Sequence, residues 1–310
     1  MNKNIHKTSI GGQAVMEGVM MKGPHKTAIS VRKPDGEIVT KIDDNPKITK
    51  NKFLKLPIIR GCVAFVDSLI NGTKAIMYSA EFVDLEEESE SKFDKWLDKV
   101  FGDKIKDVVI YFSVILSVIL SVGLFILVPS FIAGFVKLVV KNAFVLTLVE
   151  GIVRIVIFLT YLWAVSKMPD IKRVFEYHGA EHKTIACYEA GEELTIENAK
   201  KHTRLHPRCG TSFLFIVMIV SIILFSFLSW DMNILLRTVS RILLMPVVAG
   251  ISYEFIKYAG RHDNGLTKII SFPGLCLQKI TTCEPDDTQL EVAIESMKAV
   301  LTDNPEEDKW

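Results

Sequence analysis

Long apolar runs separate polar segments through the middle of the chain. The run 108–136 holds no charged residue, and it is longer than the roughly 20 residues that an α-helix needs to cross a bilayer. Three further apolar runs follow, at 143–165, 211–230 and 240–258. The second run carries Glu150 and Arg154, which stand four residues apart and can pair along a helix. We therefore predict a mainly α-helical, polytopic membrane protein with about four spans.

The N-terminal region has the pattern of a soluble segment. Polarity alternates over 27–31 and 37–42, on either side of a Lys-Pro-Asp-Gly turn, which predicts a short β-hairpin. The glycine-studded stretch 11–23 precedes it, and we interpret this stretch as a tight loop with close backbone approach. Glu17, within the stretch, is a candidate cavity residue and a candidate catalytic residue.

Residues 58–82 have an amphipathic pattern, with a polar stripe at helical spacing and an apolar remainder. The stripe consists of Asp67, Asn71, Lys74, Tyr78 and Glu81. We predict a helix that either lies on the membrane surface or packs against the spans with its stripe facing a wet cavity. A shorter amphipathic helix is predicted at 287–301, where apolar residues repeat every three or four positions.

These patterns divide the chain into six segments. They are a glycine-rich loop and β-hairpin (1–57), an amphipathic helix with a charged connector at 86–98 (58–106), two transmembrane helices (107–165), a cytoplasmic metal-site loop (166–210), two further transmembrane helices (211–259) and a cytoplasmic tail with an amphipathic helix (260–310). Lys and Arg concentrate in the loop 166–210. Because cytoplasmic loops carry the excess of basic residues, we expect a multi-pass protein of the cell (plasma) membrane with both termini in the cytoplasm.

Composition narrows the classes of partner. The chain has 37 Lys and Arg against 36 Asp and Glu, so it lacks the basic excess of a nucleic-acid-binding protein, and we expect no nucleic-acid partner. A mean hydropathy of +0.28 favours the lipid bilayer as partner, and a homo-oligomer is compatible with this composition. Five dispersed cysteines argue against a disulfide framework and for a reducing compartment. The basic start is not followed by an apolar run, so we expect no signal peptide.

Candidate chemistry concentrates in the loop 166–210. His178 and His182 share one face of a predicted helix, and Glu181 gives them the H-x-x-E-H order of the inverted zincins. His206 or Cys209, in the string H-P-R-C of the same loop, can supply a third ligand. Neutral imidazole and thiolate are the usual ligands of zinc, so these residues predict a site for a divalent metal ion, with zinc as the expected ion.

Two interpretations of this cluster compete. A pair of histidines on one helical face also occurs as ordinary buried core, and a single pair at this spacing is only suggestive. If a metal ion is bound, Glu181 stands where a general base can take a proton from water, because a catalytic zinc site keeps one position open. Glu254, near the cytoplasmic end of the last apolar run, could add a ligand or a base.

Several longer strings resemble one known family. They are G-G-Q-A-V-M-E-G-V-M-M-K-G-P (11–24), L-P-I-I-R-G (56–61), E-Y-H-G-A-E-H-K (176–183), R-L-H-P-R-C-G-T (204–211) and E-P-D-D-T-Q-L-E-V-A-I (284–294). In these strings the chain resembles, nearly from end to end, the YqhQ-type membrane proteins of the DUF1385 family. The resemblance implies a metal-dependent membrane enzyme with no established reaction. Matched by position, the motif residues are Glu17, Glu176, His178, Glu181, His182, His206, Cys209, Glu284 and Asp286.

Three functions fit these observations. The first is a metal-dependent hydrolase at the cytoplasmic face, with Glu181 and Glu17 as catalytic candidates and with contacts to ligand or substrate from Glu176, Glu254, Glu284 and Asp286. The second is a transporter or channel, whose path Glu150, Arg154 and Glu254 would line. The third is a non-catalytic membrane scaffold with a structural metal ion. The scaffold differs from the enzyme in tolerating Glu181→Gln, since only turnover needs a general base.

Overall fold

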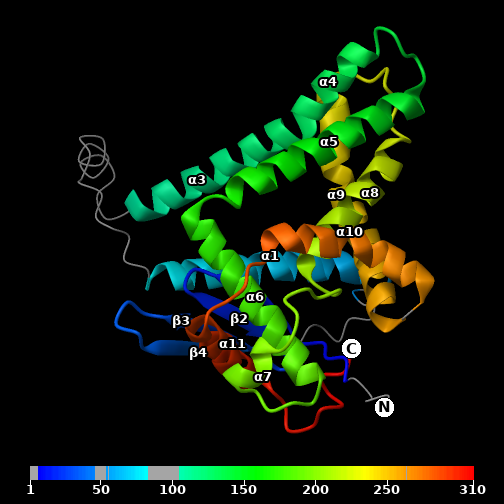
Figure 1. The fold of residues 1–310 in the computed structure, drawn as a ribbon. Helices are drawn as coiled ribbons and strands as arrows, with labels where there is room; N and C mark the ends of the chain where they lie inside the picture. Colours follow the sequence, from blue (N-terminus) through cyan, green and yellow to red (C-terminus); the bar gives the residue numbers. More distant parts are fainter. Residues whose placement is uncertain (1–5, 46–53, 55, 83–104, 263) are drawn as a thin grey trace. The chain divides into compact units, whose positions relative to one another are not determined.

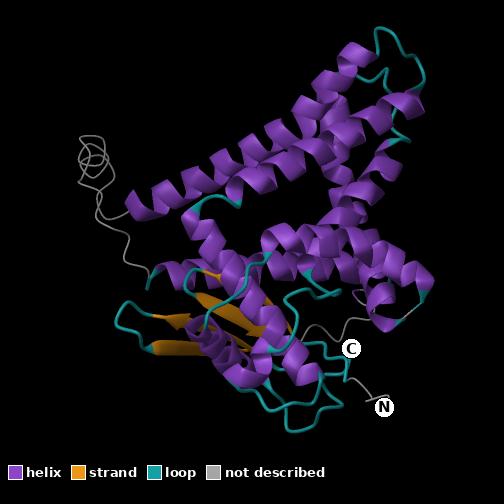
Figure 2. Cartoon of the chain, in the orientation of Figure 1, coloured by secondary structure: helices purple, strands orange, loops and turns teal. Residues whose placement is uncertain are grey.

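The computed structural model describes residues 6–45, 54, 56–82, 105–262 and 264–310, and it is mainly helical with one small sheet (Figures 1 and 2). The charged connector expected at 86–98 lies outside the described residues. In chain order the elements are β1 (Gly11–Val15), β2 (Gly18–Lys22), β3 (Lys26–Arg32), β4 (Ile38–Asp44), α1 (Ile59–Ala80), α3 (Ile105–Val122), the π-helical turn η3 (Gly123–Leu127), α4 (Val128–Val136), α5 (Ala143–Val165), α6 (Pro169–Glu189), α7 (Ile196–Lys200), α8 (Gly210–Phe225), α9 (Ile234–Arg261), α10 (Gly265–Thr281) and α11 (Asp287–Val300).

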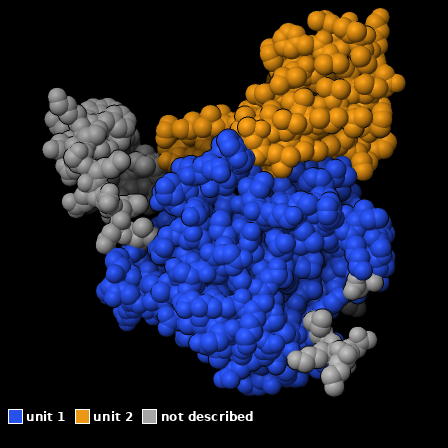
Figure 3. Space-filling model, in the orientation of Figure 1, with its two compact units in different colours: residues 1–83, 162–221, 244–310 blue, residues 84–161, 222–243 orange. Residues whose placement is uncertain are grey.

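The chain divides into two compact units (Figure 3). Unit 1 comprises residues 1–83, 162–221 and 244–310, and unit 2 comprises residues 84–161 and 222–243. Unit 1 therefore gathers both ends of the chain and its middle segment. The chain leaves unit 1 twice and returns to it twice.

The sheet of unit 1 is an antiparallel meander in the order β1-β2-β3-β4. The predicted hairpin is confirmed as β3 and β4, which pair from Arg32–Ile38 to Lys26–Asp44. The tight loop predicted for the glycine-studded stretch is wrong, because β1 and β2 form a second hairpin there. Its glycines serve close packing between strands: a Cβ at Gly18 would lie 2.3 Å from the carbonyl oxygen of Ser30.

Both faces of the sheet are covered by helices. Val19 and Met21 of β2 join the core formed with α6 and α11, whereas Met20 between them joins the core formed with α1. This alternation follows from the two-residue period of a strand. The first strand, β1, is left at the edge between α1 and α6, and this edge is where the candidate site lies.

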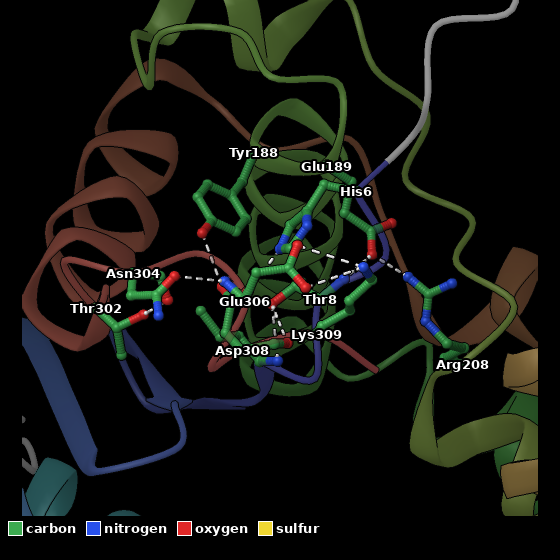
Figure 4. Close-up of polar contacts among 11 residues, drawn as sticks. His6, Thr8, Tyr188, Glu189, Arg208, Thr302, Asn304, Glu306, Asp308 and Lys309 are labelled. Atoms are coloured by element: carbon green, nitrogen blue, oxygen red, sulfur yellow. Dashed lines mark hydrogen bonds and ion pairs between the residues drawn. The ribbon is translucent and has the colours of Figure 1, made fainter.

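The two ends of the chain meet in unit 1. Thr8 and Lys309 form an antiparallel bridge, and the Trp310 N–H donates to the Lys7 carbonyl at 2.9 Å. Asp308 is fully buried and accepts from the Tyr188 hydroxyl of α6 at 2.7 Å (Figure 4). The N-terminal segment, the end of α6 and the tail are thereby held as one structure.

Of the about four spans expected, the described residues contain three candidates. Among the described residues, the helices long and apolar enough to cross a membrane are Phe112–Val136, Ala143–Val165 and Ile234–Arg261. The run 211–230 falls short because its helix, Gly210–Phe225, has 16 residues. The run 240–258, which looked weaker in sequence, lies inside the 28-residue helix α9 despite Pro246.

A close approach to α6 fixes the chain that follows α10. The Cys283 N–H donates to the Phe175 carbonyl at 2.8 Å, and a Cβ at Gly179 would lie 2.0 Å from the Cys283 carbonyl oxygen. This contact accounts for a glycine in the middle of a helix, a position where glycine is otherwise unfavourable.

We predict that Gly179→Ala destabilises the protein by about 2 kcal/mol or more, because the added methyl group forces the segment around Cys283 away from α6. Thermal unfolding in detergent measures the effect. Gly265→Ala is the matched control, since a Cβ there meets no atom within 4 Å. Equal melting temperatures for the two variants would contradict this account of the contact.

Candidate functional site

Backbone carbonyls orient the two histidines of α6. His178 Nδ1 lies 2.8 Å from the Thr281 carbonyl oxygen, and His182 Nδ1 lies 2.6 Å from that of Arg204. A carbonyl can only accept, so each Nδ1 carries the proton and each Nε2 keeps a lone pair that can accept a hydrogen bond or bind a metal ion. Hydrogen bonds of this kind are what holds metal-binding histidines in the correct tautomer and orientation.

Cys209 completes a group of three ligand atoms. Its Sγ lies 3.2 Å from His178 Nε2, and one ligand atom each from His178, His182 and Cys209 lie within 4.8 Å of one another. Ligands held tetrahedrally by zinc at about 2.0–2.3 Å are about 3.3–3.6 Å apart. The donor set and its spacing therefore fit a zinc ion after small side-chain movements.

Glu181 and His182 each bury a polar atom that has no partner among the described residues. Glu181 Oε1 accepts the Gly12 N–H at 3.0 Å, but its Oε2 and the Nε2 of His182 make no hydrogen bond. Such atoms are rare in proteins, because each costs about 1–3 kcal/mol of desolvation. Both belong to the residues that a metal ion and its water would satisfy.

Burial shifts the titration of both groups. It raises the pKa of Glu181, an effect opposed by His178 and by the bond to Gly12, and it lowers the pKa of His182. The His182 imidazole is therefore neutral near pH 7, which is the form that binds a metal ion. Each direction follows from the cost of placing a charge away from water.

A pocket of about 410 Å³ opens beside the cluster at the edge of β1. Its walls come from β1 and β2, from α1, from α6 and from the start of α8, and they include His178, Glu181 and Cys209. Gly12 is needed here, since a Cβ would lie 2.9 Å from the Glu181 carboxyl carbon. The pocket thus places ligand atoms, a buried carboxyl and a strand edge on one cavity.

Helix α1 is confirmed in the region where an amphipathic helix was predicted. Asn71 of its polar stripe lines the pocket and donates to Asp67 at 3.0 Å. On its apolar remainder, Val66, Leu69 and Ile70 are at least half exposed. Of the stripe, Asn71 therefore faces a cavity, whereas Tyr78 packs against the core of the sheet. The position of α1 relative to a membrane stays a prediction.

His206 lies next to the ligand cluster but bonds elsewhere. Gln278 fixes its backbone through two hydrogen bonds of 2.7 Å, and its ring centroid is 5.5 Å from that of His182. Its Nε2 lies 3.6 Å from Glu189. Of the two alternatives for the third ligand, the geometry brings Cys209 to the cluster and leaves His206 beside it.

Glu189 links this neighbourhood to the N-terminal segment (Figure 4). Its carboxylate accepts the Thr8 N–H at 2.8 Å and also bonds Arg208. Although burial alone would raise the pKa of Glu189, the neighbouring His206 imidazole and the charge of Arg208 hold it below the ordinary value. Glu189 is therefore a charged group at neutral pH and fixes the loop that carries Cys209.

The remaining predicted site residues lie in local contacts outside the pocket lining. Glu17, with φ of 50° in the turn between β1 and β2, pairs with Arg173 and accepts from Tyr177. Asp286 caps α11 by accepting the Gln289 N–H at 2.9 Å. These bonds stabilise a turn and a helix start, and they do not bring either carboxylate to the ligand cluster.

Glu176, Glu254 and Glu284 are also paired away from the cluster. Glu176 accepts from Gln289 at 3.0 Å, and Glu254 forms a two-bond ion pair with Arg60 of α1. The Glu284 side chain, 68% exposed, pairs with Lys183 at 3.0 Å and Arg204 at 3.3 Å. The sequence analysis made Glu176 and Glu284 candidates by a motif match and Glu254 by its place near the end of the last apolar run. In the fold each of them satisfies a nearby cation or amide.

The structure contains features that the sequence analysis missed. Cys187, Glu192 and His202 form a second group with ligand atoms within 4.8 Å of one another. The only sequence signal was His202, which stands four residues before His206. The Thr281 and Arg204 carbonyls, which orient the site histidines, carry no side-chain signal at all.

Comparison with known proteins places the chain in a family. A family model described as "Protein of unknown function (DUF1385)" matches residues 56–303. The chain belongs to the DUF1385 family. It is similar to "Uncharacterized protein YqhQ" of Bacillus subtilis (strain 168), at 37% identity over 309 residues that cover 97% of this chain and 95% of the relative. No solved structure matches the chain.

The residues of the ligand cluster all fall within the part of the chain that the DUF1385 model matches. Neither that family nor its Bacillus subtilis member carries an assigned reaction. The family expected from the sequence motifs is therefore confirmed. The metal-dependent enzyme that the resemblance implies stays a prediction.

We predict about one zinc ion per chain in protein purified in detergent without chelators, and loss of most of it in His182→Ala. His182 supplies a buried nitrogen that has no other partner among the described residues. Mass spectrometry of metal content checks this, with His262→Ala as control because His262 is exposed and its Nδ1 bonds the Tyr258 carbonyl of α9 at 3.0 Å. If the wild-type protein contains no metal ion, the prediction is wrong and the three residues are ordinary buried side chains.

Proposed function

We propose that the protein is a metal-dependent hydrolase, with His178, His182 and Cys209 as ligands of a zinc ion and Glu181 as general base. The observation that supports this most is the convergence of two correctly protonated imidazoles and a thiol beside a buried carboxyl, at the wall of a pocket. Three protein ligands leave the open position that distinguishes a catalytic zinc site from a structural one.

Each residue has a separable role in this proposal. When bound, a zinc ion in such a site supplies an acidified water molecule and polarises the bond to be cleaved. The Gly12 N–H holds Oε1 of Glu181. This leaves Oε2, the oxygen without a hydrogen-bond partner, to take a proton from the attacking water and return it to the leaving group. The Thr281 and Arg204 carbonyls keep the two imidazoles in one tautomer throughout.

The edge of β1 supports an extended peptide as the substrate. The Gly12 N–H points away from β2 toward Glu181, so the alternation of an antiparallel ladder turns the backbone groups of Ala14 outward as well. Residues 11–14 line the pocket. An added strand can hydrogen-bond to such an edge while its own side chains enter alternate pockets, a common way of holding peptides.

The scaffold hypothesis remains the main alternative. The Glu181–Gly12 hydrogen bond joins α6 to β1, and a metal ion at this point would also tie the loop at Cys209 to α6. The transporter hypothesis has less support, because Glu150 and Arg154 pair within unit 2 while Glu254 pairs with Arg60 in unit 1.

We further propose that the apolar helices cross the cell membrane as two hairpins, with both termini and the loop 166–210 in the cytoplasm. The sheet, α6 and α11 precede, separate and follow the apolar helices in the chain, yet they pack into one core, so crossings must occur in pairs. Such pairing joins α3–α4 with α5, and α8 with α9, and it makes the 16-residue α8 a short fourth crossing. The basic residues of 166–210 favour the cytoplasmic side.

We expect Glu181→Gln to keep its metal and to lose hydrolytic activity by at least about 100-fold, because general acid–base catalysis contributes 10²–10⁴. Protein in proteoliposomes is incubated with a peptide library, and new termini are counted by mass spectrometry. Glu197→Gln, an exchange in the first turn of α7, is the matched control. Wild-type protein that cleaves nothing while Glu181→Gln stays folded and loaded would favour the scaffold.

Reporter fusions test the proposed topology. Reporters active on only one side of the membrane, placed at the N-terminus, the C-terminus and between Glu192 and Glu193, should all report the cytoplasm. Reporters in the turns 137–142 and 226–233 should report the opposite side. Opposite signals from the two termini would rule out paired crossings.

A further inference from the structure

Unit 2 buries more positive than negative charge. Arg154, Arg237 and Arg241 are 8%, 6% and 1% exposed, whereas Glu150 is the one buried carboxylate among the described residues of this unit. An uncompensated charge is expensive away from water, and in an apolar helical segment it marks a functional site more often than a structural one. The excess therefore calls for an anion.

Glu150 cannot satisfy all three arginines. Both of its oxygens accept from Arg241, and Oε1 also accepts from the Ser130 hydroxyl at 2.9 Å and from Arg154 at 3.1 Å. Two guanidinium groups and a hydroxyl thus use the acceptor capacity of the carboxylate. Arg237 is left outside this network.

Arg237 is the buried cation that still lacks a hydrogen-bond acceptor. In the described part of the chain nothing accepts from its guanidinium, and its buried Nε has no partner. It stacks over the Trp230 ring at 4.0 Å, a contact that holds the guanidinium plane but accepts no proton. A guanidinium in this state presents a planar fork that matches a phosphate or carboxylate group.

Arg237 lines a pocket of about 380 Å³ that belongs entirely to unit 2. Lys137 also lines the pocket, donates to the Trp230 carbonyl at 2.8 Å and pairs with the exposed carboxylate of Asp231 at 3.3 Å. Most of the remaining wall is apolar and open to the surroundings: Phe131, Phe135 and Leu138 are 63%, 58% and 81% exposed. The pocket thus combines two cations with a surface suited to hydrocarbon.

We propose that this pocket binds the phosphate group of an anionic phospholipid. The phosphate oxygens accept from Arg237 and Lys137, and the acyl chains lie on the exposed apolar side chains of α4. Trp230, in the turn between α8 and α9, is buried and donates its indole N–H to the Thr147 hydroxyl at 3.0 Å, so its ring is a fixed platform for the Arg237 guanidinium. A free phosphate ion shares the charge but leaves the apolar wall unused, which is why a lipid is the favoured source.

The test uses the full chain in dodecyl maltoside and follows thermal unfolding as a lipid is added. Phosphatidylglycerol is expected to raise the melting temperature of the wild type in a saturable manner. Arg237→Gln should weaken the apparent affinity at least about tenfold, the usual loss for one charge-assisted hydrogen bond. Arg261→Gln, which removes an exposed arginine from the end of the same helix, should leave the affinity unchanged.

Two further arms distinguish the sources of the anion. Phosphatidylcholine, which is zwitterionic, and inorganic phosphate should each bind at least about tenfold more weakly than phosphatidylglycerol. If inorganic phosphate or phosphatidylcholine stabilises the wild-type protein as much as phosphatidylglycerol does, the proposal of an anionic-lipid site is overturned without any variant. If Arg237→Gln fails to fold, Lys137→Gln takes its place, and an affinity equal to that of the wild type would overturn the proposal.

Discussion

The contact between the centre of α6 and the segment that follows α10 is the constraint on which the candidate site depends. Gly179 lets the backbone at Cys283 lie directly against the helix, and the Thr281 carbonyl then reaches His178. In the same segment, the Thr282 hydroxyl accepts from the Arg204 guanidinium. The backbone carbonyl of Arg204 in turn accepts from His182. The tautomers of both histidines are therefore set by one packing event.

The two units leave different kinds of buried polar atom without a partner. In the described part of unit 1 these atoms include Oε2 of Glu181 and Nε2 of His182, which a cation would satisfy, and otherwise they are Arg32 Nε, Thr184 Oγ1, Ser212 Oγ and Trp310 Nε1. In the described part of unit 2 they are the Nε atoms of Arg237 and Arg241. Arg241 bonds Glu150 through its other two nitrogens, so Arg237 is the group that an anion would satisfy. Since few buried polar atoms in proteins lack a partner, both places are natural positions for bound groups.

Periodicity in the sequence predicted those elements whose side chains alternate without interruption. The strands β3 and β4 and the helices α1, α6 and α11 were found in this way. The hairpin of β1 and β2 was missed because glycines at Gly11, Gly12 and Gly18 interrupt the alternation of side chains. Gly12 and Gly18 allow a close approach to the neighbouring strand. The extent of α8 was overestimated because hydropathy continues beyond Phe225 while the helix does not.

The candidate site was predictable only as far as its own helix reaches. His178, Glu181 and His182 are neighbours on α6, so their spacing revealed them. The choice between His206 and Cys209 depends on Gln278, which lies about seventy residues away and bonds the backbone of His206. Likewise the partners of Glu17 and Glu284 are distant in sequence, so a motif gave no indication that these carboxylates are engaged in ion pairs.

The bridge between Thr8 and Lys309 has a consequence for how the protein is made. The ribosome makes His178, His182 and Cys209 well before Thr281, whose carbonyl orients His178. The bridge itself forms only once Lys309 has been made. The site therefore gains its orienting carbonyl only after both apolar excursions from unit 1 have been made, and a chain interrupted before Thr281 never acquires it.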